Sequence, residues 1–362
     1  MFMRHSILCL TISIFTTTSA MKKILLFTII TTISQYTCYS QDLKNPVEYL
    51  SYIGEEYSKI AKDQWSYTRA VGHGKGARKV EKRRLEVAQA IGEAKRRISR
   101  MPALNGSTSF RDSVMTYMNI SYHLIKEDYA KIVDMEEVAE ESYDQMEAYI
   151  LAKKRATEKS SKAYEIVRKE QDIFARENNI NMVESTSKIG QRLKKSSQVF
   201  DYYNKVYLIF FKSYKQDLYL HEALNRQDVN AIEQNRSALK KYSSEGREKL
   251  KLLTNFNGDQ SLYISARQML QFYSDQAENK TSIQVEYLIK KDQFDKIKSA
   301  FDKIKSSKKT QADIDKYNTA IDDLNLASNA YNKVGKQLHE ENVKRLANWN
   351  KKSNEFLDRH IP

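Results

Sequence analysis

Cysteine, proline and glycine are scarce in this 362-residue chain, and their scarcity excludes several classes of protein. Both cysteines, Cys9 and Cys38, lie in the first 40 residues, so the rest of the chain has no thiol for a disulfide, a metal site or a nucleophile. Three prolines and ten glycines leave few turns, which predicts long helices. After residue 40 no stretch approaches the roughly twenty uncharged residues of a transmembrane helix, so we expect no transmembrane segment.

The common catalytic motifs are missing as well. The histidines after residue 40 are His73, His123, His221, His339 and His360. None belongs to an H-E-x-x-H motif, and none follows a glutamate at the spacing of di-iron bundles. The chain also lacks a G-x-S-x-G elbow and a Walker loop. We therefore expect no enzyme activity, metal or cofactor; only a site assembled from side chains on different helices would escape this search.

Residues 21–40 have the features of a secretory leader. A short basic start at Met21 is followed by an apolar run over residues 24–33 and by a polar end, in which the small Ser40 precedes Gln41. This pattern predicts export through the inner membrane, with cleavage after Ser40. The destination would be the periplasm, the cell surface or the medium.

Two further features of the N-terminal region bear on this prediction. Residues 1–20 are themselves signal-like, which indicates that Met21 is the true start and that residues 1–40 take no part in the fold. Cys38 has a second interpretation, as the lipidated first residue of a lipoprotein. The residues before it, Gln35, Tyr36 and Thr37, do not match the Leu and small residues that a lipoprotein peptidase normally needs, so we do not expect a lipoprotein.

The charge balance is clearly basic, with a formal net charge of +14 for the whole chain. Removing residues 1–40 takes away three basic residues and no acid, so the remaining chain is still basic. This balance favours an anionic surface or an envelope protein as partner, although the partner is unknown, and we expect no nucleic acid. The alternative is that Lys and Glu simply alternate on solvated helix faces.

Apolar residues recur at three- and four-residue spacing almost throughout, which predicts an all-α protein of long antiparallel helices. The expected helices cover residues 46–70, 77–100, 109–132, 135–178 and 311–357, the last with heptad-like spacing. Ser109 and Asp112 resemble a capping box at the start of the third helix. The segment 199–220 is apolar on two sides, which is typical of a central helix in a bundle.

An apparent internal duplication divides the chain. Leu104-Asn105-Gly106 is echoed by Phe256-Asn257-Gly258 at an offset of 152 residues, and flanking apolar positions keep the same offset. We therefore expect two tandem, related and elongated helical bundles, at residues 41–180 and 181–362. Chance similarity between two amphipathic helical segments is the alternative.

One glycine-rich basic segment, residues 72–84, has the composition of an anion site. Three glycines within residues 72–76 would let backbone N–H groups approach a ligand, and the segment opens into a predicted helix whose N-terminus attracts anions. The candidate ligands for a small anion or acidic glycan are His73, Lys75, Arg78, Lys79 and Arg83. Alternatively, the glycines only form the turn between two antiparallel helices.

Residues 65–81, WSYTRAVGHGKGARKVE, resemble a family of uncharacterised bacterial surface proteins, mainly from Bacteroidetes-type bacteria and named from a spirochaete surface protein. Further similarity lies at residues 134–137, 202–215, 348–350 and 356–360. The typical member has Ala and Ser where this chain has Gly72 and Gly76. The resemblance implies an exported helical surface protein and transfers no catalytic residue. Together, these observations predict a non-enzymatic envelope or surface interaction module.

Overall fold

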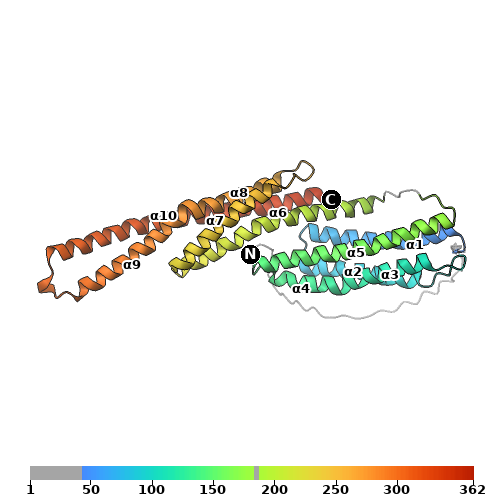
Figure 1. Ribbon diagram of the computed structural model, residues 1–362, viewed down its shortest axis with the longest axis horizontal. Helices are drawn as coiled ribbons and strands as arrows, with labels where there is room; N and C mark the ends of the chain where they lie inside the picture. The colour runs from blue at the N-terminus through green and yellow to red at the C-terminus, as the bar shows by residue number, and fades with distance from the viewer. Residues whose placement is uncertain (1–42, 183–186) are drawn as a thin grey trace, which may run out of the picture.

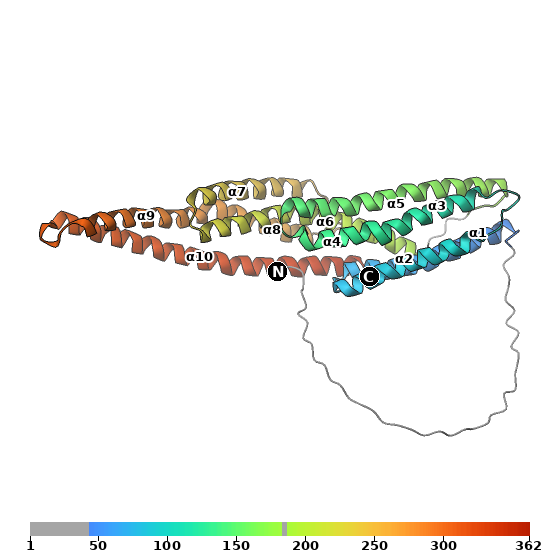
Figure 2. The ribbon, with the colours of Figure 1, turned by 90° about the horizontal axis from the view of Figure 1, so that it is seen from below.

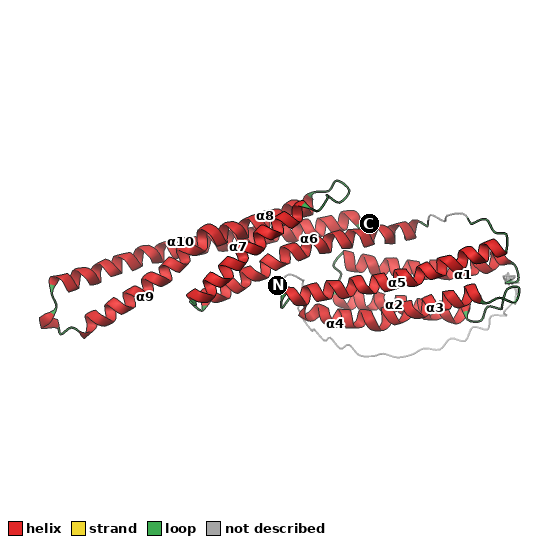
Figure 3. Ribbon diagram, in the orientation of Figure 1, coloured by secondary structure: helices red, strands yellow, loops and turns green. Residues whose placement is uncertain are grey.

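The computed structural model describes residues 43–182 and 187–362, and within them it is helical, with no strand longer than an isolated bridge (Figure 3). The predicted all-α class is therefore confirmed. The leader, Met21 and the cleavage position lie outside the described residues. The helices are α1 (Pro46–Gly72), α2 (Ala77–Ile98), α3 (Ser109–His123), α4 (Tyr129–Ala139), α5 (Tyr143–Glu177), α6 (Lys188–Asn225), α7 (Val229–Lys251), α8 (Ser261–Asp275), α9 (Thr281–Lys303) and α10 (Gln311–His360).

The helices form two bundles that lie end to end in an elongated molecule (Figures 1 and 2). Helices α1 to α5 surround one apolar core, in which Tyr49 stacks on Phe174 with ring centroids 5.7 Å apart. Helices α6 to α10 supply most of a second core, in which Tyr202 contacts Phe356 at the same centroid distance of 5.7 Å. Most apolar side chains thus pack within their own bundle.

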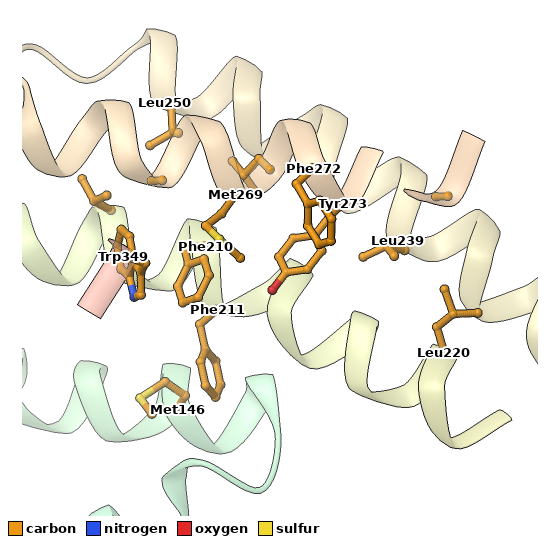
Figure 4. Close-up of a cluster of buried hydrophobic side chains, with 14 of the residues drawn as sticks. Met146, Phe210, Phe211, Leu220, Leu239, Leu250, Met269, Phe272, Tyr273 and Trp349 are labelled. Atoms are coloured by element: carbon orange, nitrogen blue, oxygen red, sulfur yellow. The ribbon is translucent and has the colours of Figure 1, made fainter. Parts of the chain in front are cut away.

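Helix α6 is the element that joins the bundles. It packs against α7, α8 and α10 on one side and against α1 and α5 on the other, which agrees with its two apolar stripes. Trp65 of α1 and Met146 of α5 belong to the second core rather than the first. Figure 4 shows Met146 reaching toward Phe211, and Trp349 beside Phe210. The predicted boundary near residue 180 therefore separates helices that still share part of a core.

Local backbone geometry repeats between the bundles at the positions that the sequence pairs. Asn105 and Asn257 both have φ of 50°, and Gly106 and Gly258 both have φ of 82°. A short bridge closes each of these turns. Helices α3 and α8 each have 15 residues, and a five-residue π-helical turn follows each, at Leu124–Asp128 and Gln276–Lys280. The duplication itself stays a prediction.

The predicted break near residue 132 and the predicted cap of the third helix both differ from the structure, in which the helical run continues to Ala139. A single helix from residue 135 to 178 is wrong, because the chain turns between α4 and α5, and Ser142 caps α5 by accepting from the Gln145 amide at 3.2 Å. The capping box at Ser109 is also wrong. The N-cap of α3 is Thr108, whose hydroxyl donates to Asp112 at 2.7 Å instead of accepting from the backbone.

The hairpin of α9 and α10 is much longer than its counterpart in the first bundle. Helices α4 and α5 have 11 and 35 residues, whereas α9 and α10 have 23 and 50. None of the residues 289–333 is buried. Figures 1 and 2 show this part of the hairpin, which we call the arm, projecting beyond the turn between α6 and α7. None of the described helices has the length and apolarity needed to cross a membrane.

The two Asn-Gly turns generate a first prediction. Replacing Gly106 or Gly258 by Ala places a Cβ on a left-handed backbone, so each change should lower the free energy of unfolding by about 1–2 kcal/mol. Because the two turns have the same φ, the two losses should be similar in urea unfolding. Gly54→Ala, in an exposed part of α1 with φ in the helical range, is the control and should instead stabilise by roughly 1 kcal/mol. Clearly unequal losses would contradict the equivalence of the turns.

Candidate functional site

The glycine-rich segment forms the turn between α1 and α2. The Lys75 amide donates to the Ala70 carbonyl at 3.0 Å and the Gly74 amide to the Val71 carbonyl at 3.1 Å, which is the hydrogen-bond pattern of a Schellman motif. Gly74 occupies its left-handed position with φ of 57°. A Cβ on Gly72 would lie 2.8 Å from Cδ1 of Ile361, so this glycine admits a close contact from α10. The structure thus explains why glycine occupies positions 72 and 74.

Two of the five predicted anion ligands, His73 and Arg83, are already paired with carboxylates. His73 turns toward the end of α10, where its Nδ1 lies 2.6 Å from Oδ1 of Asp358. Lys75, Arg78 and Lys79 are exposed. Arg83 forms an ion pair with Glu86 on the next turn of α2, at 2.6 Å. Anion binding at residues 72–84 stays a prediction, whereas the turn accounts for Gly74 and the contact with Ile361 accounts for Gly72.

The end of α10 is held to the turn between α7 and α8 by a partly buried carboxylate. Asp259, in the turn before α8, accepts from His360 at 2.9 Å and from Arg359 at 2.5 Å, and it also accepts from the Ser261 amide at 2.8 Å. Burial acts to raise the pKa of Asp259, but the bonds from Ser261 and His360 and the Arg359 charge hold it at about 2. Ile361, which follows, is fully buried against Gly72. Residues 72–73 and 358–361 thus meet here.

A polar network that the sequence did not predict lies inside the second bundle. Asp217 of α6 is only 1 % exposed. Its carboxylate accepts from Gln276 at 2.7 Å and from Asn342 at 3.2 Å, and His221 lies 3.3 Å away. These partners come from the π-helical turn after α8, from α10 and from α6 itself. An unpaired buried charge costs several kcal/mol. Any movement that separated Asp217 from its partners would carry this cost, so the network stabilises the observed placement of α6, the π-helical turn and α10 relative to one another.

Some polar atoms around Asp217 have no hydrogen-bond partner in the described structure. They are the hydroxyls of Ser213 and Tyr273 and the amide oxygens of Gln276 and Asn342. Burial, together with the nearby Asp217 charge, raises the pKa of Tyr273 well above its usual value. Hydrogen bonding to Asp217 raises the pKa of His221 to about 9, although burial opposes this shift. The protonated imidazole thus offsets the buried carboxylate at neutral pH.

The first bundle holds its π-helical turn with a different side chain. Arg84 of α2, 4 % exposed, donates to the carbonyls of Ile125 and Lys126, which that turn leaves available. Its other nitrogens donate to Glu81 at 2.8 and 2.6 Å. In the second bundle the Thr281 hydroxyl donates to the carbonyl of the first π-turn residue at 3.0 Å. Each π-helical turn is thus held by a hydrogen bond from a buried side chain.

The described residues hold no group of metal-ligating side chains, and they contain an open groove beside α6. Across residues 43–182 and 187–362, no three His, Cys, Asp or Glu side chains are placed to hold a metal ion together. An open groove of about 510 Å³ lies between α6 and the segment after α7, and its lining includes Asp201, Lys205 and Leu252. Asp201 and Lys205 pair with each other at 2.6 Å across one turn of α6.

Comparison with known proteins adds no further information: no family model, no curated protein and no solved structure matches the chain. The resemblance of residues 65–81 to bacterial surface proteins therefore stays a prediction, as does the absence of enzyme activity.

The Asp217 network generates a prediction for pH. The pKa of His221 in the fold, about 9, is above its ordinary value of 6.5, so the charged imidazole is favoured by folding. The resulting stability is complete below pH 6.5 and is lost as the pH rises through about 9. The His221 side chain is 44 % exposed, which reduces the size of the effect through solvent screening.

The measurement is urea unfolding between pH 6 and 10 for wild type and His221→Gln. The difference in unfolding free energy between the two proteins should shrink as the pH rises through this range. His339→Gln, on an exposed part of α10, is the control and should leave the pH dependence unchanged. A difference that stays constant with pH would rule out the coupling of His221 to Asp217.

Proposed function

We propose that this chain is an exported, non-enzymatic helical protein of the bacterial envelope or surface, which uses the arm to engage a partner. The leader pattern at residues 21–40 and the resemblance of residues 65–81 support export to the envelope. The lack of catalytic motifs in the sequence supports a binding role. Asp217, Arg84 and Asp259 form hydrogen bonds with residues of neighbouring elements, which supports a structural role for these polar side chains.

The observation that carries the proposal is the arm. A hairpin in a bundle needs buried side chains to contribute to the stability of the fold, yet none of the residues 289–333 is buried. The two helices of the arm contact each other through a narrow apolar seam, where Phe301 stacks on Tyr317 at 4.5 Å and Phe294 lies 5.9 Å from the same ring. The first bundle is complete without such an extension. An interaction surface is the role that best accounts for it.

The repeat supports the same proposal. We infer that the two bundles derive from one duplicated unit, because the Asn-Gly turns and the π-helical turns recur with the same geometry. The α9–α10 hairpin is then the part in which the second unit has diverged most from the first. The hairpin has become longer in a segment that contains no buried residue, which indicates a function specific to the second bundle.

Export can be tested directly. The protein expressed with its own N-terminus in a Gram-negative host should be recovered outside the cytoplasm with an intact mass that begins at Gln41, because Ser40 precedes the expected cleavage point. Ser40→Leu should slow processing, whereas Ser34→Leu, further from the cleavage point, should have less effect. A cytoplasmic protein that retains residues 21–40, or a lipid-modified Cys38, would contradict the proposal.

The role of the arm can be tested with a photo-crosslinking residue. Leu326, on α10 within the arm, is 74 % exposed, so replacing it should not disturb packing. In cells that produce the protein naturally, we expect a discrete adduct from position 326. The control is Ile166 on α5, which is 58 % exposed and lies outside the arm. Adducts from position 166 alone, or identical adducts from both positions, would overturn the assignment of the arm.

A further inference from the structure

The tip of the arm concentrates positive charge. Between α9 and α10 the chain reads Lys303-Ile304-Lys305-Ser306-Ser307-Lys308-Lys309, with no acidic residue from 303 to 309. Lys303, Lys305 and Lys308 are exposed and form no ion pair in the described part of the chain. Lys309 lies over the ring of Phe301, 3.8 Å from its centroid. We call residues 303–309 the tip.

The lysines behind the tip differ from those in it. Along the shaft of the arm, Lys290 pairs with Asp323 at 2.7 Å, and Lys296 pairs with Asp292 at 2.6 Å. The shaft is therefore largely neutralised by its own aspartates, whereas the tip is not. The positive charge at the tip is consequently a local property and does not simply follow from the basic composition of the chain.

The corresponding end of the first bundle has the opposite charge. Glu140 and Glu141 lie in the turn between α4 and α5, Asp144 and Glu147 lie at the start of α5, and no basic side chain occurs among residues 138–152. If basic residues at helix ends served solubility alone, the two hairpin ends would not need to differ in sign. The contrast indicates that the tip is matched to a negatively charged partner.

We propose that the tip docks the protein on the surface of an anionic lipid bilayer. This inference rests on the proposed function, since it names the partner of the arm. Lysines act as point charges toward phosphates and need no bidentate geometry, which suits a fluid layer of headgroups. Half-exposed Ile304 lies between two lysines, so it can enter the headgroup region while its neighbours contact phosphates.

The shape of the tip favours a bilayer over other anions. The tip is the end of a projecting hairpin (Figure 2), and its residues Lys303, Lys305 and Lys308 are exposed. Nucleic-acid binding to single strands usually adds aromatic rings on which bases stack. The nearest ring, Phe301, is already covered by Lys309 and Tyr317. A flat anionic surface requires neither an enclosed pocket nor a free aromatic ring, so it suits the tip best.

The test is co-sedimentation of purified protein with vesicles. Wild type should bind vesicles of phosphatidylcholine that contain phosphatidylglycerol and should not bind pure phosphatidylcholine. Binding should weaken as salt is raised, because the Debye length shortens. Since each lysine near such a surface changes the partition constant by about fivefold, Lys305→Glu/Lys308→Glu should lower it by at least about 25-fold. Ile304→Ser should weaken binding further than Ile304→Leu.

The matched control is Lys194→Glu/Lys195→Glu at the start of α6. These two lysines are also exposed, and the double change alters the net charge by the same amount. This control should bind as wild type does. Thermal unfolding of all variants should coincide, because none of the substituted residues is buried.

Three outcomes would overturn the inference. Equal loss in the control would show that net charge, not the tip, governs binding. Absence of wild-type binding to the anionic vesicles would exclude the bilayer as partner. If soluble inorganic polyphosphate abolished vesicle binding completely and Ile304→Ser bound the vesicles as well as wild type, the tip would be a general polyanion site. In each case the crosslinking from position 326 still reports separately on whether the arm engages a partner.

Discussion

Burial of α6 on two sides is the constraint on which the rest of the structure depends. A helix with a single apolar stripe can be covered by one bundle, but α6 presents apolar side chains both to α7, α8 and α10 and to α1 and α5. Both groups of helices must therefore lie along it. This requirement places Trp65 and Met146, which come from the first half of the chain, in the second core. It also brings the last residues of α10 to the α1–α2 turn, where Ile361 fills the space that Gly72 leaves. The molecule is consequently elongated, with a junction that is apolar inside and linked by His73 and Asp358 at its edge.

Much of the fold could be predicted because its signals are local. Pro46 at the start of α1, the Asn-Gly turns and the two-sided stripe of α6 each leave a direct mark in the sequence, and the structure has these features at the expected residues. The break between α4 and α5 was missed because Ser142 is a single capping residue inside a continuous helical pattern. The π-helical turns were missed for a different reason. One extra residue per turn shifts the apolar stripe only slightly, and the hydrogen bonds that hold such a turn come from helices distant in the sequence.

At the candidate site, too, the features with a local sequence signal could be predicted and those that depend on distant residues could not. The glycine-rich segment was found because three glycines and several basic residues lie together in the sequence, but its two structural contacts are with Asp358 and Ile361, nearly 300 residues away. The Asp217 network could not be found in this way, since its members lie on α6, a π-helical turn and α10 and have no common spacing. The available signal was Asp217 itself, a carboxylate within the segment 199–220, which is apolar on two sides. The tip was readable as a run of lysines, yet its meaning depends on the neighbouring shaft, where pairing with aspartates across the hairpin becomes visible only in three dimensions.

Helix α10 also has a mechanical consequence. It runs without interruption for 50 residues, which corresponds to about 75 Å at 1.5 Å per residue. One end begins at the tip of the arm, and the other ends against the α1–α2 turn of the opposite bundle. Along the way, Asn342 and Trp349 anchor the helix to α6. A single helix therefore connects the tip of the arm with the contact between Ile361 and Gly72, and between these points it packs against α9, α8 and α6. A force applied at the tip would therefore be transmitted along α10 to the contact between Ile361 and Gly72.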